Sequence, residues 1–222
     1  MKILVIADEE EKGLWDFYDR ERTAGVDLII SCGDLDHNYL DFLVTMVNCP
    51  LLYVRGNHDQ KYAKKPPEGC ICIEDMVYNY NGLRILGLGG SMRYKPGPDM
   101  YTETEMRRRI QRLKRRIRLM NGFDLLVTHA PAQGYGDMED LPHMGFACFN
   151  ELMDQYKPKY MLHGHVHASY GRITREHAHP SGTQIINCCG SRMLELKEGD
   201  YPLKGKTGSF IYDFYISLKS RK

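Results

Sequence analysis

The chain has 222 residues, of which 42% are hydrophobic and 27% are charged, so it is long enough and apolar enough to bury a full core. Its formal net charge of +1 at pH 7 gives no overall reason to expect nucleic acid or an anionic membrane as a partner. No apolar run reaches the length that crosses a membrane, and Met1 leads directly into an apolar segment, which leaves no room for a signal peptide. We expect a single domain that spans residues 1–222.

The cysteines indicate the redox compartment. There are seven of them, an odd number, and most lie in apolar surroundings. Structural disulfides join cysteines in pairs, whereas buried free thiols are typical of proteins in a reducing compartment. We therefore expect a cytoplasmic protein.

Five apolar runs are typical of buried strands. They cover residues 2–7, 27–33, 51–56, 124–128 and 160–164. Helical spacing of apolar residues predicts helices elsewhere, and further runs predict hairpin-like strands. The predicted helices are 14–23, 38–47, 103–120 and 146–156, and the additional strands are 71–80, 83–89, 184–189, 193–196 and 209–218. This order favours an α/β fold in which a two-sheet β-sandwich is flanked by helices.

The last predicted strand, 209–218, alternates polar and apolar residues only partly. Such a strand is expected either at the edge of a sheet or in a contact with a second subunit. A homo-oligomer is therefore one of two alternatives.

Polar residues follow each of the five buried runs. In a layered α/β fold, side chains just past the ends of neighbouring strands converge on one edge of the sheet. Carboxylates, an amide oxygen and imidazoles suit Mn, Fe or Zn, and the absence of cysteine from these clusters argues against a thiolate zinc site. The pattern predicts a metal site, with two ions favoured over one. The clusters are Asp8 with Glu10, Asp34, Asn57-His58-Asp59, His129, and His165-Val166-His167.

The ordered set of clusters resembles the calcineurin-like metallophosphoesterase family, and its small bacterial members in particular. The family pattern is DxH, GDxx, GNHD or GNHE, a lone His after a strand, and GHxH. The corresponding segments here are Ala7-Asp8-Glu9-Glu10, Gly33-Asp34-Leu35-Asp36, Gly56-Asn57-His58-Asp59, Thr128-His129-Ala130 and Gly164-His165-Val166-His167. Each motif alone is weak, but their order and spacing match over about residues 3 to 190. The resemblance implies a four-layer α/β/β/α fold and a hydrolase of phosphoric ester bonds.

The resemblance also implies how the metal ligands are shared. Two ions roughly 3.5–4 Å apart lower the pKa of a bridging water, so that hydroxide is available to attack phosphorus. Asp34 would bridge the two ions. The implied ligands are Asp8, Glu10, Asp34 and His167 for one ion, and Asp34, Asn57, His129 and His165 for the other.

His58 has no ligand role in the family. It would protonate the leaving oxygen or stabilise charge on the phosphoryl group, and Asp59 would orient its ring and raise its pKa. We also expect Asn57, His58, His143 and Arg93 to contact the substrate, His143 because it lies in a loop that follows His129 and Arg93 because it follows a glycine-rich run.

The chain departs from the family pattern at Glu10, where the first motif usually has His. An anionic oxygen in place of a neutral nitrogen makes the site harder, so we expect Mn or Fe rather than Zn, and it makes the bridging water less acidic. Two alternatives remain: position 10 supplies no ligand, or Glu9 or Glu11 presents the carboxylate.

An arginine-rich segment, 107–118, holds eight basic residues in twelve, with apolar residues at helical spacing. One interpretation is a surface helix whose apolar stripe faces a sheet and whose arginines are solvated. The other is a patch that steers a phosphate-rich substrate or nucleic acid, which requires the patch to lie beside the metal cleft.

Fold and motifs do not select the substrate. We expect a phosphodiester of a small molecule or nucleotide, because the chain lacks the long insertions that would enclose a protein. The alternatives are a phosphomonoesterase or phosphoprotein phosphatase, and a weakly active metal-binding scaffold in which Glu10 has impaired turnover.

Overall fold

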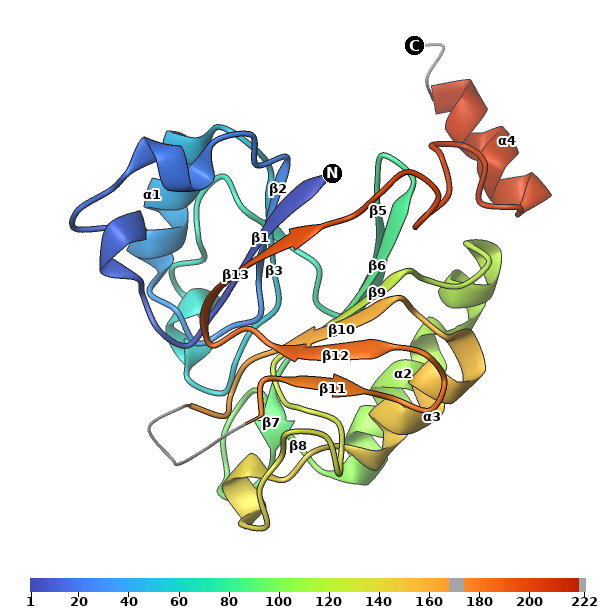
Figure 1. Cartoon of the computed structure of the whole chain (residues 1–222). Coiled ribbons are helices and arrows are strands. Elements are labelled where there is room, and N and C mark those ends of the chain that lie inside the picture. Colours follow the sequence, from blue (N-terminus) through green and yellow to red (C-terminus); the bar gives the residue numbers. More distant parts are fainter. Residues whose placement is uncertain (168–173, 220–222) are drawn as a thin grey trace.

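The computed structural model describes residues 1–167 and 174–219. Two main β-sheets pack against each other, and helices cover their outer faces (Figure 1). The first sheet has the order β13 (Gly190–Glu195), β1 (Lys2–Ala7), β2 (Leu28–Ser31), β3 (Leu51–Tyr53) and β4 (Ile71–Cys72). The second sheet has the order β11 (Glu176–Ala178), β12 (Gln184–Asn187), β10 (Tyr160–His163), β9 (Leu125–Thr128), β6 (Leu83–Leu88) and β5 (Met76–Tyr80). The predicted α/β sandwich is confirmed.

Strand direction decides where the polar clusters lie. In the first sheet β1 to β4 are parallel, and β13 runs antiparallel to β1. In the second sheet β6, β9, β10 and β12 are parallel, and the two edge strands β5 and β11 are antiparallel to their neighbours. A small pair, β7 (Ser91–Met92) with β8 (Met100–Tyr101), lies outside both sheets. The carboxyl ends of the parallel strands therefore meet at one edge of each sheet.

The described residues contain four α-helices and four short 3₁₀ helices. They are α1 (His37–Val47), α2 (Glu103–Leu119), α3 (Ala147–Tyr156) and α4 (Phe210–Lys219), with short 3₁₀ helices at Lys12–Leu14, Arg20–Thr23, Asp59–Ala63 and Leu141–His143. None of the helices in the described part of the chain is long and apolar enough to span a membrane.

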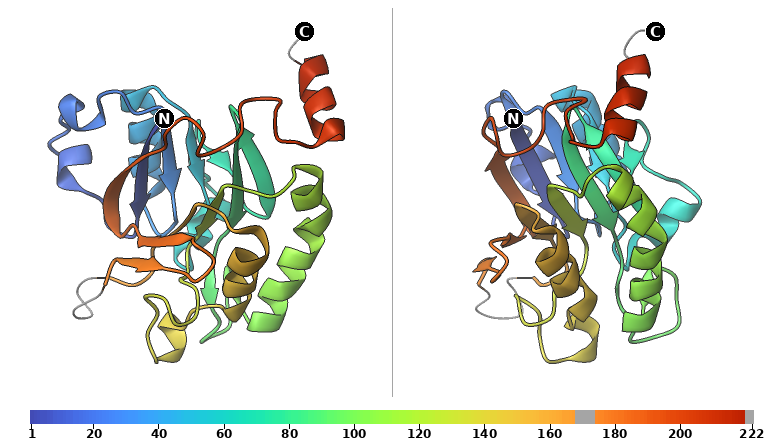
Figure 2. Two further views of the ribbon diagram at one scale, coloured as in Figure 1. Left: turned by 45° about the vertical axis from the view of Figure 1, so that its right-hand side comes forward. Right: turned by 90° about the vertical axis from the view of Figure 1, so that its right-hand side faces the viewer.

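Three apolar clusters hold the four layers together. The middle cluster includes Val5, Ile30 and Leu125 and fills the space between the sheets. A second cluster packs α1 on the first sheet, and a third packs α2 and α3 on the second sheet. Figure 2 shows α2 and α3 side by side against the second sheet. Because side chains alternate between the faces of a strand, β1 supplies Ile3 and Val5 to the middle cluster and the intervening residues to the α1 cluster.

The arginine-rich segment forms α2, and its apolar stripe is buried as the first interpretation expects. Met106, Ile110, Leu113 and Ile117 lie in the core cluster between α2 and the second sheet. Thr102 and Glu105 form a capping box at the start of the helix. The exposed Arg116 lines a cavity of about 660 Å³ beside β5 and α4, which is not the cleft of the metal site described below.

Arg109 is the exception among the arginines of α2, because it is buried. Its Nε donates to Asp75 Oδ1 at 2.8 Å, its Nη1 donates to the carbonyl of Gly89 at 2.7 Å, and its Nη2 bonds Glu74. Glu74 in turn accepts from the backbone N–H of Arg55, next to the predicted metal-site loop. No pattern in the sequence indicates this ion pair, since Arg109 sits among other arginines.

The prediction of a strand at 209–218 was wrong. These residues form α4, whose apolar side chains Phe210, Phe214 and Leu218 recur every four residues. The Asp213 carboxylate accepts bonds from the backbone N–H groups of Thr207 and Gly208, which fixes the turn into the helix. A subunit contact through an edge strand therefore loses its basis.

Two further predicted elements are broken. The predicted helix 14–23 is not formed: only residue 14, the end of the 3₁₀ helix Lys12–Leu14, and residues 20–23 are helical. Trp15 packs on Tyr39 and Phe42 of α1, and the Asp19 carboxylate accepts from Glu21 N at the start of the second 3₁₀ helix. The predicted strand 71–80 divides into β4 and β5 at Asp75, whose φ of 53° is left-handed.

We predict that Arg109→Ala lowers the free energy of unfolding by about 3–5 kcal/mol, because it leaves the buried carboxylate of Glu74 without its cation. The measurement is urea denaturation, with Arg108→Ala on the exposed face of α2 as the matched control. The control is expected to change the free energy by no more than about 0.5 kcal/mol. Equal effects in the two variants would contradict this assignment.

Candidate metal centre

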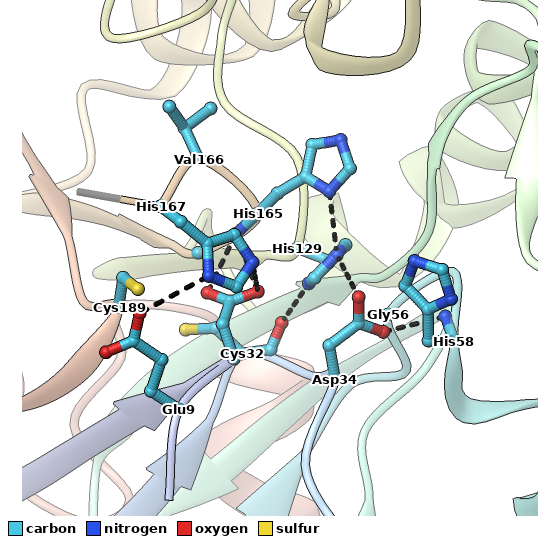
Figure 3. A network of polar contacts seen from close by, with 12 residues as sticks. Glu9, Cys32, Asp34, Gly56, His58, His129, His165, Val166, His167 and Cys189 are labelled. Atoms are coloured by element: carbon cyan, nitrogen blue, oxygen red, sulfur yellow. Dashed lines mark hydrogen bonds and ion pairs between the residues drawn. The ribbon is translucent and has the colours of Figure 1, made fainter. Parts of the chain in front are cut away.

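The predicted site residues come together where the carboxyl ends of strands from both sheets meet (Figure 3). Asp8 directly follows β1, and Asp34 comes three residues after β2. His129 directly follows β9, and His165 comes two residues after β10. The carboxylates thus come from the first sheet and the imidazoles from the second, and the site spans the interface between the sheets.

The backbone at this site is strained. Asp8, Asp34 and His165 have φ angles of 62°, 57° and 71°, in the left-handed region that side chains with a Cβ rarely adopt. The turn at Asp8 lets its carboxylate accept from the backbone N–H of His165 at 2.9 and 3.0 Å. Strain of this kind persists only where the surrounding contacts fix it, and it is frequent at functional sites.

Two glycines make room for the carboxylates. A Cβ at Gly56 would collide with the Asp34 carboxylate, and a Cβ at Gly164 would collide with the Asp8 carboxylate. Glycine is therefore required at both positions for the backbone to pass this close to the charged groups.

Four side chains converge into one group of potential metal ligands. His129 Nε2 lies 3.2 Å from Asp34 Oδ2 and 3.1 Å from Asn57 Oδ1, and His165 Nδ1 lies 3.1 Å from His129 Nε2. These are the four residues that the sequence predicted for one ion.

The second nitrogen of each ring, which points away from the group, is hydrogen-bonded to a backbone carbonyl. His129 Nδ1 lies 2.9 Å from the carbonyl of Cys32, and His165 Nε2 lies 2.8 Å from the carbonyl of Pro142. Because a carbonyl oxygen can only accept, His129 Nδ1 and His165 Nε2 each carry a proton. The nitrogens left to bind a metal ion are His165 Nδ1 and, once it has lost its own proton, His129 Nε2, and these two face each other. Metal-binding histidines are oriented by this kind of second bond, so the donor set fits a divalent ion.

The pKa values show that the pocket favours a positive charge at its centre. Burial opposes protonation of His129, but the Asp34 and Asp8 carboxylates outweigh it and raise the pKa of His129 to about 10. Burial also opposes ionisation of Asp34, but the ring of His129 outweighs it and lowers the pKa of Asp34 to about 2. Burial and then His129 lower the pKa of His165 to about 3. His165 is thus neutral and able to bind a metal ion.

A second group of ligand atoms lies beside the first. Asp8 is fully buried, and burial followed by the charge of Asp34 raises its pKa to about 6, against the opposing effect of His129. His167 Nε2 lies 3.9 Å from Asp8 Oδ1, and His167 Nδ1 lies 3.4 Å from Glu9 Oε1. Glu9, His167 and Cys189 offer ligand atoms that all lie within 4.8 Å of one another.

The structure does not bring Glu10 into this group. Its Oε1 accepts from the backbone N–H of Asp36 at 3.0 Å, and Glu9 occupies the place beside His167. Both glutamates follow the left-handed turn at Asp8, whose φ is 62°. Cys189, which belongs to none of the clusters found in the sequence, lies with Glu9 and His167.

A cleft of about 250 Å³ opens over the ligand set. His58 and His143, two of the residues expected to contact the substrate, line this cleft. Tyr94 and Pro142 line it as well, and neither lies in a motif that the sequence reveals. The residues that line the cleft are Asp34, Asn57, His58, Tyr94, Pro142, His143, His165 and His167.

Asp59 and Arg93 make contacts other than those expected from the sequence. Asp59 Oδ2 accepts from the backbone N–H groups of Asp34 and Gly56 at 2.8 Å each, so the carboxylate positions the metal-site loops rather than the ring of His58. Arg93 does not line the cleft: its guanidinium pairs with Glu105 at 2.9 Å and bonds the carbonyl of Met100.

Comparison with known proteins gives one family match. The model of the calcineurin-like phosphoesterase family matches residues 1–169. Two curated Caenorhabditis elegans proteins are similar in sequence. UPF0046 protein T07D4.2 is 33% identical over 155 residues, which cover 67% of this chain and 37% of that protein. UPF0046 protein C25E10.12 is 30% identical over 112 residues, which cover 47% of this chain and 37% of that protein. The aligned part of the chain thus spans little more than a third of these relatives.

A solved structure shares the fold. The protein TT1561 of Thermus thermophilus aligns with a TM-score of 0.61 at 16% sequence identity, over 85% of this chain and 89% of that one. At this identity the likeness concerns the fold alone.

We predict that a divalent ion displaces the proton of His129 when it binds. Because the pKa of His129 lies near 10, the ring is protonated at pH 7 in the metal-free protein, and metal affinity rises by up to about tenfold per pH unit between pH 7 and 9. Calorimetric titration in buffers with different ionisation enthalpies measures the protons released. A binding enthalpy independent of the buffer, with an affinity independent of pH, would contradict the prediction.

Proposed function

Because the chain belongs to the calcineurin-like phosphoesterase family, we propose that it hydrolyses phosphoric ester bonds with divalent metal ions. The observation that carries the proposal is the arrangement of two histidines below the cleft. His129 Nδ1 and His165 Nε2 are bonded to backbone carbonyls, His129 Nε2 faces Asp34 and Asn57, and His165 Nδ1 faces His129 Nε2. Two imidazole rings that are oriented by backbone carbonyls and direct their other nitrogens toward each other beside a carboxylate are typical of a metal site.

Two ions are proposed rather than one. Asp34 belongs to the first ligand group through its contact with His129, and its charge also acts on Asp8 in the second group. Asp34 is therefore the proposed bridge. One ion would be held by Asp34, Asn57, His129 and His165, and the other by Asp34, Asp8, His167 and a carboxylate that we now assign to Glu9 in place of Glu10.

The metals proposed are first-row divalent ions. Oxygen and imidazole ligands at the Asp34, Asn57, His129 and His165 position suit Mn or Fe. When bound, such ions polarise the phosphoryl group and lower the pKa of water. The preference against Zn that rested on Glu10 no longer has that support, because the Glu10 carboxylate is bonded to Asp36 N.

His58 is the proposed proton donor. Its backbone N–H donates to Asp34 Oδ1 at 2.8 Å, which holds the residue at the metal group, and its exposed ring lines the cleft. The ring is thus free to reach a leaving oxygen without serving as a ligand. Asp59 acts as a positioning residue, through its bonds to the backbone of Asp34 and Gly56.

The proposed substrate is a small phosphodiester, including one of a nucleotide. The cleft of about 250 Å³ is slightly smaller than the roughly 300–1,000 Å³ of most small-molecule sites, which favours a small substrate. His143 is the proposed phosphate contact: its ring centroid lies 5.2 Å from that of His165, and its Nδ1 lies 2.6 Å from Asp140 Oδ2. Phosphomonoesters and phosphoproteins remain the second candidate class.

We further propose that residues 1–222 form one domain that acts in the cytoplasm. All seven cysteines are free thiols, which agrees with a reducing compartment.

The experiment compares the hydrolysis of bis-p-nitrophenyl phosphate with that of p-nitrophenyl phosphate, after removal of metals and reloading with Mn, Fe(II), Zn or Mg. We expect metal-dependent cleavage of the diester to exceed that of the monoester. A preference for the monoester would transfer the proposal to the phosphatase class. Two bound ions without cleavage of either ester would leave the scaffold alternative.

We predict that His58→Ala lowers kcat on the diester by about 10²-fold or more and leaves the number of bound ions unchanged, because the ring donates a proton and holds no metal. Activity and metal content are measured in the same samples. Asn57→Ala is the contrasting variant, since its side chain belongs to the ligand set and its loss reduces metal content. Loss of metal in His58→Ala would contradict the assignment.

A further inference from the structure

Cys189 lies at the metal site because of strand pairing. Strand β13 runs antiparallel to β1 with Ala7 opposite Gly190, and Ala7 also forms a bridge with Cys189. The cysteine therefore stands beside the end of β1, next to Asp8, although the two are 181 positions apart in the sequence. Its backbone N–H donates to the Asn187 side chain at 2.9 Å and its carbonyl accepts from Arg175 at 3.0 Å, so the position is fixed from both sides.

The sulfur meets two other potential ligands. Glu9, His167 and Cys189 come from three separate segments, and Figure 3 shows their side chains directed toward one another. Their ligand atoms lie within 4.8 Å of one another, whereas the ligands of a tetrahedral ion with bonds of 2.0–2.3 Å are roughly 3.5 Å apart. Small side-chain movements therefore suffice for one ion to bind all three.

The carboxylate of Asp8 completes this group. It lies 3.9 Å from His167 Nε2 and is fully buried, so its charge needs a cation nearby. No Lys or Arg side chain pairs with Asp8 among the ion pairs of the described residues, and its partners are the backbone of His165 and the ring of His167.

We propose that the Cys189 thiolate, with Glu9, Asp8 and His167, binds the metal ion at this position, so that this half of the centre selects Fe(II), Co(II) or Zn(II) over Mn(II) and Mg(II). The inference rests on the metal-dependent function proposed above. It assigns to Glu9 and Cys189 together the coordination that the family pattern gives to a histidine at position 10.

The chemistry follows from the ligand type. Thiolate is a soft ligand that favours Zn and Fe(II), whereas Mn and Mg prefer oxygen donors. The two halves of the centre then differ, because the half with Asn57, His129 and His165 has no sulfur. Burial, followed by the charges of Asp8 and Glu9, raises the pKa of the free Cys189 thiol to about 12, so this cysteine is no reactive nucleophile in the absence of a cation.

The neighbouring cysteine provides a matched control. Cys188 is buried like Cys189, but it belongs to the apolar cluster between the sheets together with Cys32. A serine at either position changes one sulfur to oxygen, and only at position 189 does the change affect the proposed ligand set.

The test is a spectroscopic titration of the metal-free protein with Co(II). A cobalt–thiolate bond produces a charge-transfer band in the near ultraviolet, which oxygen and nitrogen ligands do not produce. We expect this band in the natural protein, its loss in Cys189→Ser and its retention in Cys188→Ser. Cys189→Ser should also lower the affinity of one of the two ions by roughly tenfold or more, and should reduce the preference for Zn over Mn.

A second pair of variants tests the carboxylate. Glu9→Gln should weaken the same ion, whereas Glu10→Gln should leave both the band and the number of ions unchanged, since Gln can still accept from Asp36 N. Absence of the band in natural protein that binds two Co(II) ions would overturn the inference, whatever the folding of the variants. A band that persists in Cys189→Ser would overturn it as well.

The two proposals fail separately. Hydrolysis of phosphoesters by protein with two ions and no charge-transfer band contradicts the thiolate ligand alone. A band that depends on Cys189, in protein that cleaves no phosphoester, contradicts the proposed function alone. A protein that binds no Co(II), Mn(II) or Zn(II) contradicts both.

Discussion

The contact between the Asp34 carboxylate and the ring of His129 is the interaction on which the site depends. It joins the first sheet to the second at 3.2 Å, and the bond between His129 Nδ1 and the carbonyl of Cys32 crosses the same interface. Neither contact exists unless the sheets pack face to face, and the apolar cluster between them provides that packing. The apolar core and the candidate metal site therefore both lie at the interface between the two sheets.

The strained backbone makes the site rigid. Left-handed conformations at Asp8, Asp34 and His165 cost about 1–3 kcal/mol each when they are unsupported. The bonds from His165 N to Asp8, and from Asp34 N to Asp59, hold these turns in place. Side chains that are already held in place need little rearrangement to bind an ion, so the site favours ions whose coordination geometry matches their arrangement.

The sequence was sufficient to identify most of the residues that the structure brings together, since apolar runs ending in polar clusters reveal both the strands and the residues at their ends. The sandwich and the convergence of Asp34, Asn57, His129 and His165 followed from that pattern. The place of Glu9 and Cys189 could not be predicted, because it depends on the left-handed turn at Asp8 and on a strand pairing between distant parts of the chain. The spacing of residues within a sequence motif indicates neither the turn nor the strand pairing. The helix α4 was missed because a nearly continuous apolar run is compatible with the repeat of 3.6 residues in a helix and with the repeat of two residues in a strand.

The most direct test of a two-ion centre built from both sheets is a crystal structure of metal-loaded protein with anomalous diffraction data. We predict two peaks on either side of Asp34. One should lie within bonding distance of His129 Nε2 and His165 Nδ1, and the other should lie beside Asp8 and His167. A single peak, or peaks that leave out the lone pairs of His129 and His165, would contradict the account.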